Sequence, residues 1–165
     1  MRPHIGLLKQ PSCALALSFG AGLSPWAPGT VGALVAFPIF AVLRLAPPAL
    51  IGAILIVFFV VGCLACGRAC TVLGQQDHGS IVWDETLGML LVLLGVPGSA
   101  LWWLTAFLAF RFFDILKPWP IHLADVYTEG GVAVMLDDVA AAIAASAVLW
   151  LAKAYVLPLL LHVSG

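Results

Sequence analysis

The stretch Leu45–Gly67, LAPPALIGAILIVFFVVGCLACG, decides the fold class of this 165-residue chain. It contains no charged residue, and it is long enough for a helix to cross the hydrocarbon core of a bilayer, which takes about 20 apolar residues. The whole chain is 63% hydrophobic and only 9% charged, whereas soluble domains carry about 25% charged residues. A soluble core of this size cannot bury so many apolar residues. The sequence therefore predicts an integral membrane protein.

Two other classes of protein are excluded by the same composition. Disordered chains are poor in apolar residues, which this chain is not. The formal net charge of −1 offers no basic surface for nucleic acid. We therefore expect the membrane, and no nucleic acid, as a partner.

Further apolar segments extend the bundle on both sides of Leu45–Gly67. The uncharged run between Glu85 and Arg111 is interrupted by Gly and Pro at positions 95–98, which predicts a helical hairpin with arms of about 15 to 18 residues. Another apolar run extends from Val139 to about position 161. With Leu45–Gly67, these segments predict three or more spanning helices.

The first apolar run, Ser12–Leu43, is punctuated by glycines and prolines. We expect an interfacial or re-entrant segment, then a loop over Leu23–Thr30 that lines a cavity, and then a spanning helix from about Val31. The predicted fold class is therefore an all-α, polytopic membrane bundle with about four to five spanning helices and a discontinuous first segment. We expect one domain, residues 1–165, and no cleavable signal peptide.

The basic residues predict an orientation. With the N-terminus in the cytoplasm and helices that alternate in direction, five of the seven bases lie on the cytoplasmic side, as the positive-inside rule requires. These five are Arg2, Lys9, Arg68, Arg111 and Lys117. The same layout brings the acidic segments and the Leu23–Thr30 loop to the cytoplasmic face, so we expect one polar site there.

All eight acids lie in one part of the chain, between positions 77 and 138: Asp77, Asp84, Glu85, Asp114, Asp125, Glu129, Asp137 and Asp138. Acidic residues in the first turn of a helix are common, because they complement the helix dipole. Two adjacent pairs, Asp84–Glu85 and Asp137–Asp138, are each predicted to stand at the start of a helix. Together at one membrane face, they offer oxygen ligands for a hard divalent cation, Mg²⁺ in particular.

A third polar element is the motif around Arg111, Asp114 and Lys117, which recur every third residue on one helix face. Local ion pairs at a helix end are the ordinary explanation. Ionisable residues at membrane depth, however, usually mark a functional site. Two cations around a carboxylate suit a phosphate ester better than an ion pathway. In the loop before Val31, Thr30 could cap the next helix and direct its N–H groups toward an anion.

These motifs resemble those of the phosphatidylglycerophosphatase A family of bacterial inner-membrane lipid phosphatases. The matching segments, in the order in which they occur, are Pro28–Gly32 (PGTVG), Asp77–Gly88 (DHGSIVWDETLG), Phe110–Pro120 (FRFFDILKPWP) and Gly130–Asp138 (GGVAVMLDD). Glu129 stands where close relatives often have His, so it is given no catalytic role. Ala33 stands where a Ser is common.

The resemblance implies Mg²⁺-dependent removal of the terminal phosphate of phosphatidylglycerophosphate, giving phosphatidylglycerol. The site would face the cytoplasm from a multi-pass protein of the bacterial inner membrane. We expect Asp77, Asp84, Asp114, Arg111 and Lys117 to be catalytic, with Arg111, Lys117 and Thr30 binding phosphate. The expected metal ligands are Asp84, Glu85, Asp137 and Asp138. His78 is a further candidate for proton transfer.

A small ion or proton-coupled transporter is the alternative function. Its clustered carboxylates would lie near the middle of several membrane helices. The sequence places them at helix ends and in loops, which favours a site open to the cytoplasm. A structural or assembly protein would have no use for so dense a cluster of charges.

Overall fold

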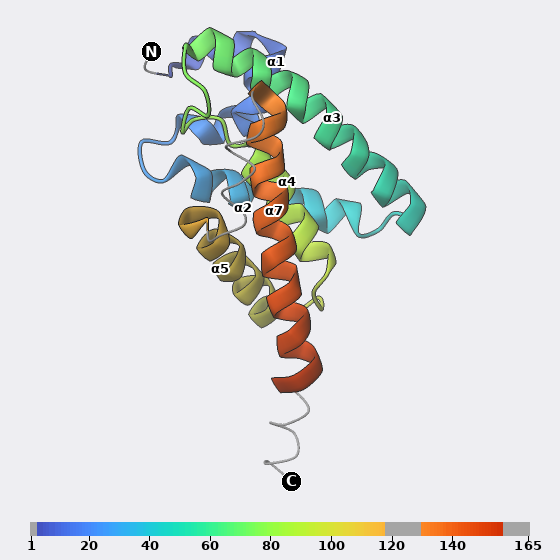
Figure 1. Cartoon of the computed structure of the whole chain (residues 1–165). Coiled ribbons are helices and arrows are strands. Elements are labelled where there is room, and N and C mark those ends of the chain that lie inside the picture. The colour runs from blue at the N-terminus through green and yellow to red at the C-terminus, as the bar shows by residue number, and fades with distance from the viewer. Residues whose placement is uncertain (1–2, 118–129, 157–165) are drawn as a thin grey trace.

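Helices form all the regular structure in the part of the chain that the computed structural model describes, residues 3–117 and 130–156 (Figure 1). The prediction of an all-α fold is confirmed. Three short elements come first: η1 (Ile5–Lys9), α1 (Pro11–Ala16) and η2 (Ser18–Leu23). The longer helices are α2 (Pro28–Leu43), α3 (Pro48–Leu73), α4 (Trp83–Leu94), α5 (Ala100–Leu116) and α7 (Gly130–Leu151), which continues into the π-helical turn η3 (Ala152–Val156).

Two of the described helices are long and apolar enough to cross a membrane, namely α3 and the segment Gly130–Tyr155. Only 17% of the most apolar window of α3 is buried inside the protein, against 50% for Gly130–Tyr155. An apolar helix so little covered by its own chain is typical of a lipid-facing span rather than of a soluble core. The count of four to five spans stays a prediction.

The predicted hairpin between Glu85 and Arg111 is present, with its break at residues 95–99. The arm α4 has 12 residues and α5 has 17, so α4 is shorter than expected. The side chain of Ser99 starts α5 by accepting a hydrogen bond from the Trp102 N–H at 3.4 Å.

The first apolar run is discontinuous, as expected, but its helix begins earlier than predicted. The chain passes through positive φ angles at Ser18 and Phe19 before it reaches α2. Since α2 starts at Pro28, the loop before it is shorter than Leu23–Thr30. Ala27 is the N-cap and Thr30 lies inside the first turn, so the expectation that Thr30 caps this helix is wrong.

The last long helix also begins earlier than predicted. The apolar run suggests a start at Val139, yet α7 extends from Gly130. Asp137 and Asp138 therefore lie inside α7 and not immediately before it, so the prediction that all acidic pairs stand at helix starts is wrong for this pair. Neighbouring helices can surround a carboxylate and give it partners. A helix can therefore include acidic residues that precede its apolar run.

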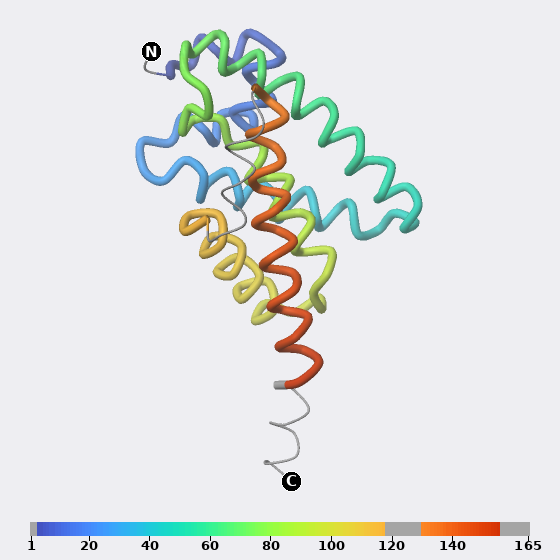
Figure 2. Tube along the Cα trace, viewed as in Figure 1, coloured from blue at the N-terminus to red at the C-terminus, as the bar shows by residue number. Residues whose placement is uncertain are grey.

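The central helix of the bundle is α7, which packs against α3, α4 and α5 (Figure 2). Its first half joins a hydrophobic cluster built on η1, α1, α3 and the start of α4, through residues such as Met135. Its second half, from Ala141 to Leu149, joins another cluster with α2, α4 and α5. Asp137 and Asp138 lie between these two apolar regions, so the packing places charge at the centre of the bundle.

Candidate functional site

Three carboxylates from two helices form the centre of the candidate site. Asp84 and Glu85 come from the first turn of α4, and Asp138 comes from α7. Each offers an oxygen, and these oxygens all lie within 4.8 Å of one another. One member of the pair Asp137–Asp138 therefore meets the pair Asp84–Glu85 in space, although about 50 residues separate them along the chain.

Close packing of α4 and α7 brings these acids together. At Gly88, one turn after Asp84, an added Cβ would lie 3.1 Å from the backbone oxygen of Asp138 and 2.7 Å from the ring of Phe110. Only a residue without a side chain allows α4 to approach both neighbours so closely. The sequence segment Asp77–Gly88 thus supplies the acids and also the gap that lets Asp138 reach them.

The carboxylates of this cluster are buried. Asp84 is 5% exposed and Asp138 3% exposed. One oxygen of each of the three acids is buried and accepts no hydrogen bond from the described residues. Buried polar atoms normally have partners. Three carboxylates with unsatisfied oxygens are the donor set of a hard cation, and they fit Mg²⁺.

The pKa values of the two acids on α4, which is not one of the candidate spans, are raised by this burial. Burial, followed by the charge of Glu85, raises the pKa of Asp84 well above its usual range. Burial and the charge of Asp138 raise the pKa of Glu85 to about 8. Burial and mutual repulsion therefore destabilise the ionised forms of these carboxylates, and a bound cation would relieve that repulsion.

The two basic residues that the sequence predicts for phosphate binding lie on α5 and at its end. The guanidinium of Arg111 pairs with Asp114, one turn farther along α5, and its Nη1 lies 4.0 Å from Oε1 of Glu85. Lys117 pairs with Asp137. Arg111 therefore borders the carboxylate cluster directly, while Asp137 lies with Lys117 rather than with Asp84, Glu85 and Asp138.

The N-terminus of α2 closes the site beside Glu85. An added Cβ at Gly29 would lie 2.2 Å from Oε1 of Glu85 and 3.2 Å from Nη1 of Arg111. Thr30 follows in the same turn. The free N–H groups and positive dipole end of a helix attract anions. This contact gives a physical reason for the Pro-Gly-Thr motif, which the sequence analysis expected to line a cavity and, through Thr30, to cap the next helix and bind phosphate.

A buried hydroxyl network next to the acids was missed by the sequence analysis. The hydroxyls of Ser18 and Thr86 lie 2.7 Å apart, and that of Thr86 donates to the Gly32 carbonyl at 2.8 Å or to the Val82 carbonyl at 3.0 Å. The network ties η2 and α2 to the first turn of α4. Thr86 lies inside the motif Asp77–Gly88, but nothing local in the sequence indicates that it is fully buried.

Asp77 and His78 lie outside the carboxylate cluster. Asp77 is exposed, in the loop between α3 and α4, with a positive φ of 46°. The Nδ1 atom of His78 accepts a hydrogen bond from the Ser80 N–H at 3.2 Å. The residues at 118–120 of the third motif, like Asp125 and Glu129, lie outside the described residues.

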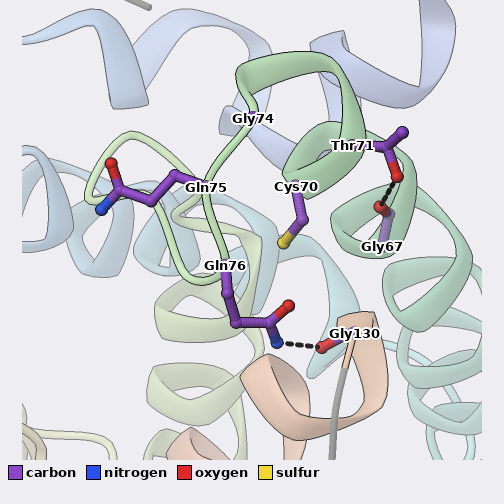
Figure 3. Close-up of a pocket in the computed structure, with 7 residues that line it drawn as sticks. All are labelled: Gly67, Cys70, Thr71, Gly74, Gln75, Gln76 and Gly130. Atoms are coloured by element: carbon purple, nitrogen blue, oxygen red, sulfur yellow. Dashed lines mark hydrogen bonds between the residues drawn. The ribbon is translucent and has the colours of Figure 1, made fainter.

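A separate polar cavity of about 340 Å³ lies where the end of α3 meets the start of α7 (Figure 3). Gln76 crosses it and donates to the Gly130 carbonyl at 3.1 Å. Thr71 on the opposite wall donates to the Gly67 carbonyl at 3.1 Å. The polar side chains of this wall are neutral, so the carboxylate cluster remains the better candidate for chemistry.

Comparisons with known proteins place the chain among its relatives. The family model described as phosphatidylglycerophosphatase A matches residues 14–153. The chain is 37% identical over 144 residues to phosphatidylglycerophosphatase A of Escherichia coli, covering 87% of this chain and 84% of that one. It is 46% identical over 142 residues to phosphatidylglycerophosphatase A of Haemophilus influenzae, covering 82% and 85%. No solved structure matches the chain.

Proposed function

This chain belongs to the phosphatidylglycerophosphatase A family, and from that premise we propose a Mg²⁺-dependent hydrolysis of the terminal phosphate monoester of phosphatidylglycerophosphate. The products are phosphatidylglycerol and inorganic phosphate. Family membership makes the chain a phosphatase that acts on phosphatidylglycerophosphate, and it leaves the transporter alternative without support. The dependence on Mg²⁺, the roles of single residues and the cellular location are the proposed part.

The observation that carries the proposal is the meeting of three carboxylates, the buried Asp84 and Asp138 and the partly buried Glu85, with an arginine. Asp84, Glu85 and Asp138 present oxygens within 4.8 Å of one another, and Arg111 lies 4.0 Å from Glu85. Hydrolysis of a phosphate monoester develops negative charge on the phosphoryl oxygens, so catalysis needs mainly positioning and positive charge. A carboxylate site for a cation beside a guanidinium supplies both.

Asp84, Glu85 and Asp138 would hold the Mg²⁺. Asp137, the neighbour of Asp138 on α7, pairs with Lys117. When bound, Mg²⁺ supplies positive charge to the phosphoryl oxygens and lowers the pKa of bound water. The protein itself orients the phosphate. The planar guanidinium of Arg111 can donate two parallel hydrogen bonds to it, and Lys117 adds a point charge. Thr30 and the N–H groups of the first turn of α2 would bind the phosphate from a third direction.

Both cationic residues already hold carboxylates, Arg111 that of Asp114 and Lys117 that of Asp137. These acids keep the cations in place before the substrate arrives. An incoming phosphate then competes for the same donors, and Asp114 acts as the positioning partner of Arg111. In the reaction, water attacks phosphorus, the ester P–O bond breaks, and the glycerol oxygen takes a proton. Asp77 or His78 would carry that proton.

We place the enzyme in the bacterial inner membrane as a multi-pass protein with its site toward the cytoplasm. Two candidate spans support membrane insertion. The lysine and arginine distribution supports the orientation.

Phosphate release by the purified protein, with Mg²⁺ or with a chelator, tests the function. We expect release from phosphatidylglycerophosphate only with the metal, and metal-independent release would overturn the Mg²⁺ proposal. A second readout is the melting temperature of the detergent-solubilised protein, which Mg²⁺ should raise because it binds only the folded state. D84N and D138N should lose both turnover and this rise. R111A should lose turnover but keep the rise, which separates metal binding from phosphate binding.

A single turnover in ¹⁸O-water distinguishes the nucleophile. Direct attack by water puts the label in phosphate on the first cycle. A covalent aspartyl-phosphate intermediate leaves the label in a protein carboxylate only if water attacks its carbonyl carbon; if water attacks its phosphorus, the label again enters phosphate. Hydroxylamine, which converts an acyl phosphate to a hydroxamate, therefore serves as the second test: a trapped aspartyl hydroxamate would overturn direct attack by water.

A further inference from the structure

An apolar groove begins one turn from the carboxylate cluster. It has a volume of about 290 Å³ and lies between α3 on one side and α4 and α7 on the other. Its lining is entirely hydrophobic: Leu55, Ile56, Phe59, Leu87, Leu91, Leu136 and Val139. The groove exists because α3 leans away from α7 toward its N-terminal end (Figure 2), after the close contacts near Gly62 and Gly67.

The groove adjoins the candidate site along α4, one turn away from Asp84. Asp84, Leu87 and Leu91 are spaced by three and four residues, so they share one face of that helix. Leu91 lies about 10 Å along the axis from Asp84, at 1.5 Å per residue. On α7, Leu136 and Val139 flank the acidic pair Asp137–Asp138. The same two helices therefore carry the charged centre and the apolar wall.

The third wall belongs to α3, the less buried of the two candidate spans. Ile56 on α3 is 67% exposed, so the groove opens toward the surroundings of a candidate span and not into the protein core. An apolar groove that lies one turn from a charged centre suited to phosphate, and that opens on the outer surface of α3, matches the chemistry of a phosphate ester that carries an acyl chain. Apolar ligands bind such sites through buried hydrophobic area.

We propose that this groove holds one acyl chain of the phospholipid substrate while its terminal phosphate lies at Asp84, Glu85 and Asp138. This inference rests on the proposed function and adds where the lipid lies. The headgroup spans the first turn of α4, and the chain lies between Ile56 and Leu91. The enzyme thereby discriminates by chain length, since a short chain makes fewer of these contacts.

Variants that fill the groove test this inference through the ratio of kcat/KM for a long-chain substrate to kcat/KM for a short-chain substrate. The assay compares kcat/KM for dioleoyl and dihexanoyl phosphatidylglycerophosphate in one detergent. I56W narrows the groove from α3, and L91W narrows it from α4. Each should lower the ratio of long-chain to short-chain kcat/KM about tenfold, since several methylene contacts are lost. V57W is the matched control, because Val57 is the next residue of α3, is 56% exposed and does not line the groove. Its ratio should equal that of the wild type.

Failure of the inference and failure of the proposed function give different results. An unchanged ratio in I56W and L91W, with phosphate release intact, would overturn the groove assignment alone. No release from either lipid by the wild type would overturn the proposed function.

A measurement on the wild type avoids any folding defect of a variant. A lipid with a photoreactive group in its acyl chain should label Leu55–Phe59 and Leu87–Leu91, and unlabelled substrate should compete. Labelling spread evenly over α3, or absent from α4, would contradict the proposal.

Discussion

At Gly29 the start of α2 comes so close to Glu85 that no side chain fits between them. An exposed helical Gly→Ala change normally stabilises by about 1 kcal/mol. Here we expect G29A to displace Glu85 and Arg111 and to lower turnover about a hundredfold, because small misplacements of catalytic groups are costly. Phosphate release and the Mg²⁺-induced rise in melting temperature measure the effect. G95A is the control, since its Cβ would make only an ordinary 3.5 Å contact. Equal activity of the two variants would contradict the role of Gly29.

Thr86 acts at the same scale through one hydroxyl. Its side chain is fully buried and joins Ser18 to the Gly32 carbonyl. We expect T86V to lower the free energy of unfolding by about 1–3 kcal/mol, because it leaves buried polar groups without their partner. T86S keeps the hydroxyl and should retain most of that stability. Thermal melting in detergent measures both variants, and a T86V protein as stable as the wild type would show that the network contributes nothing.

At the scale of elements, the crossing of α3 and α7 depends on Gly131. An added Cβ there would lie 1.8 Å from the Cys63 carbonyl oxygen and 2.4 Å from the Gly67 nitrogen. We expect G131A to push the two helices apart and to cost about 1–3 kcal/mol, as overpacking does. G52A on α3 is the control, because nothing lies within 4 Å of its added Cβ. The melting temperature of G131A should therefore lie below that of G52A. Equal melting temperatures would show that α3 and α7 leave room for a side chain at Gly131.

The cysteines of α3 belong to the same crossing. Cys63, Cys66 and Cys70 are free thiols, the last two buried. They lie near one helix face, where a cysteine packs as a small apolar residue, and Cys66 contacts Met135 of α7 at 3.9 Å.

At the scale of the whole molecule, the exposed apolar surface of α3 is the feature that distinguishes a membrane protein from a soluble one. Val60 lies near the middle of that helix and is 51% exposed. On a water-facing surface V60R would be nearly neutral. In a lipid-facing span an arginine at the helix centre costs about 2.5–3.5 kcal/mol. We therefore expect V60R to reduce the share of protein in carbonate-washed membranes, whereas T71R, near the helix end, should not. Normal insertion of V60R would argue against lipid contact at Val60.

The sequence by itself determined the helical class, the hairpin break and the residues from which the site is built, because apolar runs, Gly–Pro breaks and rare charges are local signals. It did not determine where α2 and α7 begin: α2 starts at Pro28, inside its apolar run, and α7 starts at Gly130, before its apolar run, where neighbouring helices pack around it. Only the tertiary structure grouped Asp138 with Asp84 and Glu85 and paired Asp137 with Lys117. Adjacent residues on a helix point about 100° apart, and the neighbouring helices decide which of the two faces the centre. The uncharged stretch Leu45–Gly67 predicted a span, while the lean of the longer helix α3 away from α7 opened the groove beside the site.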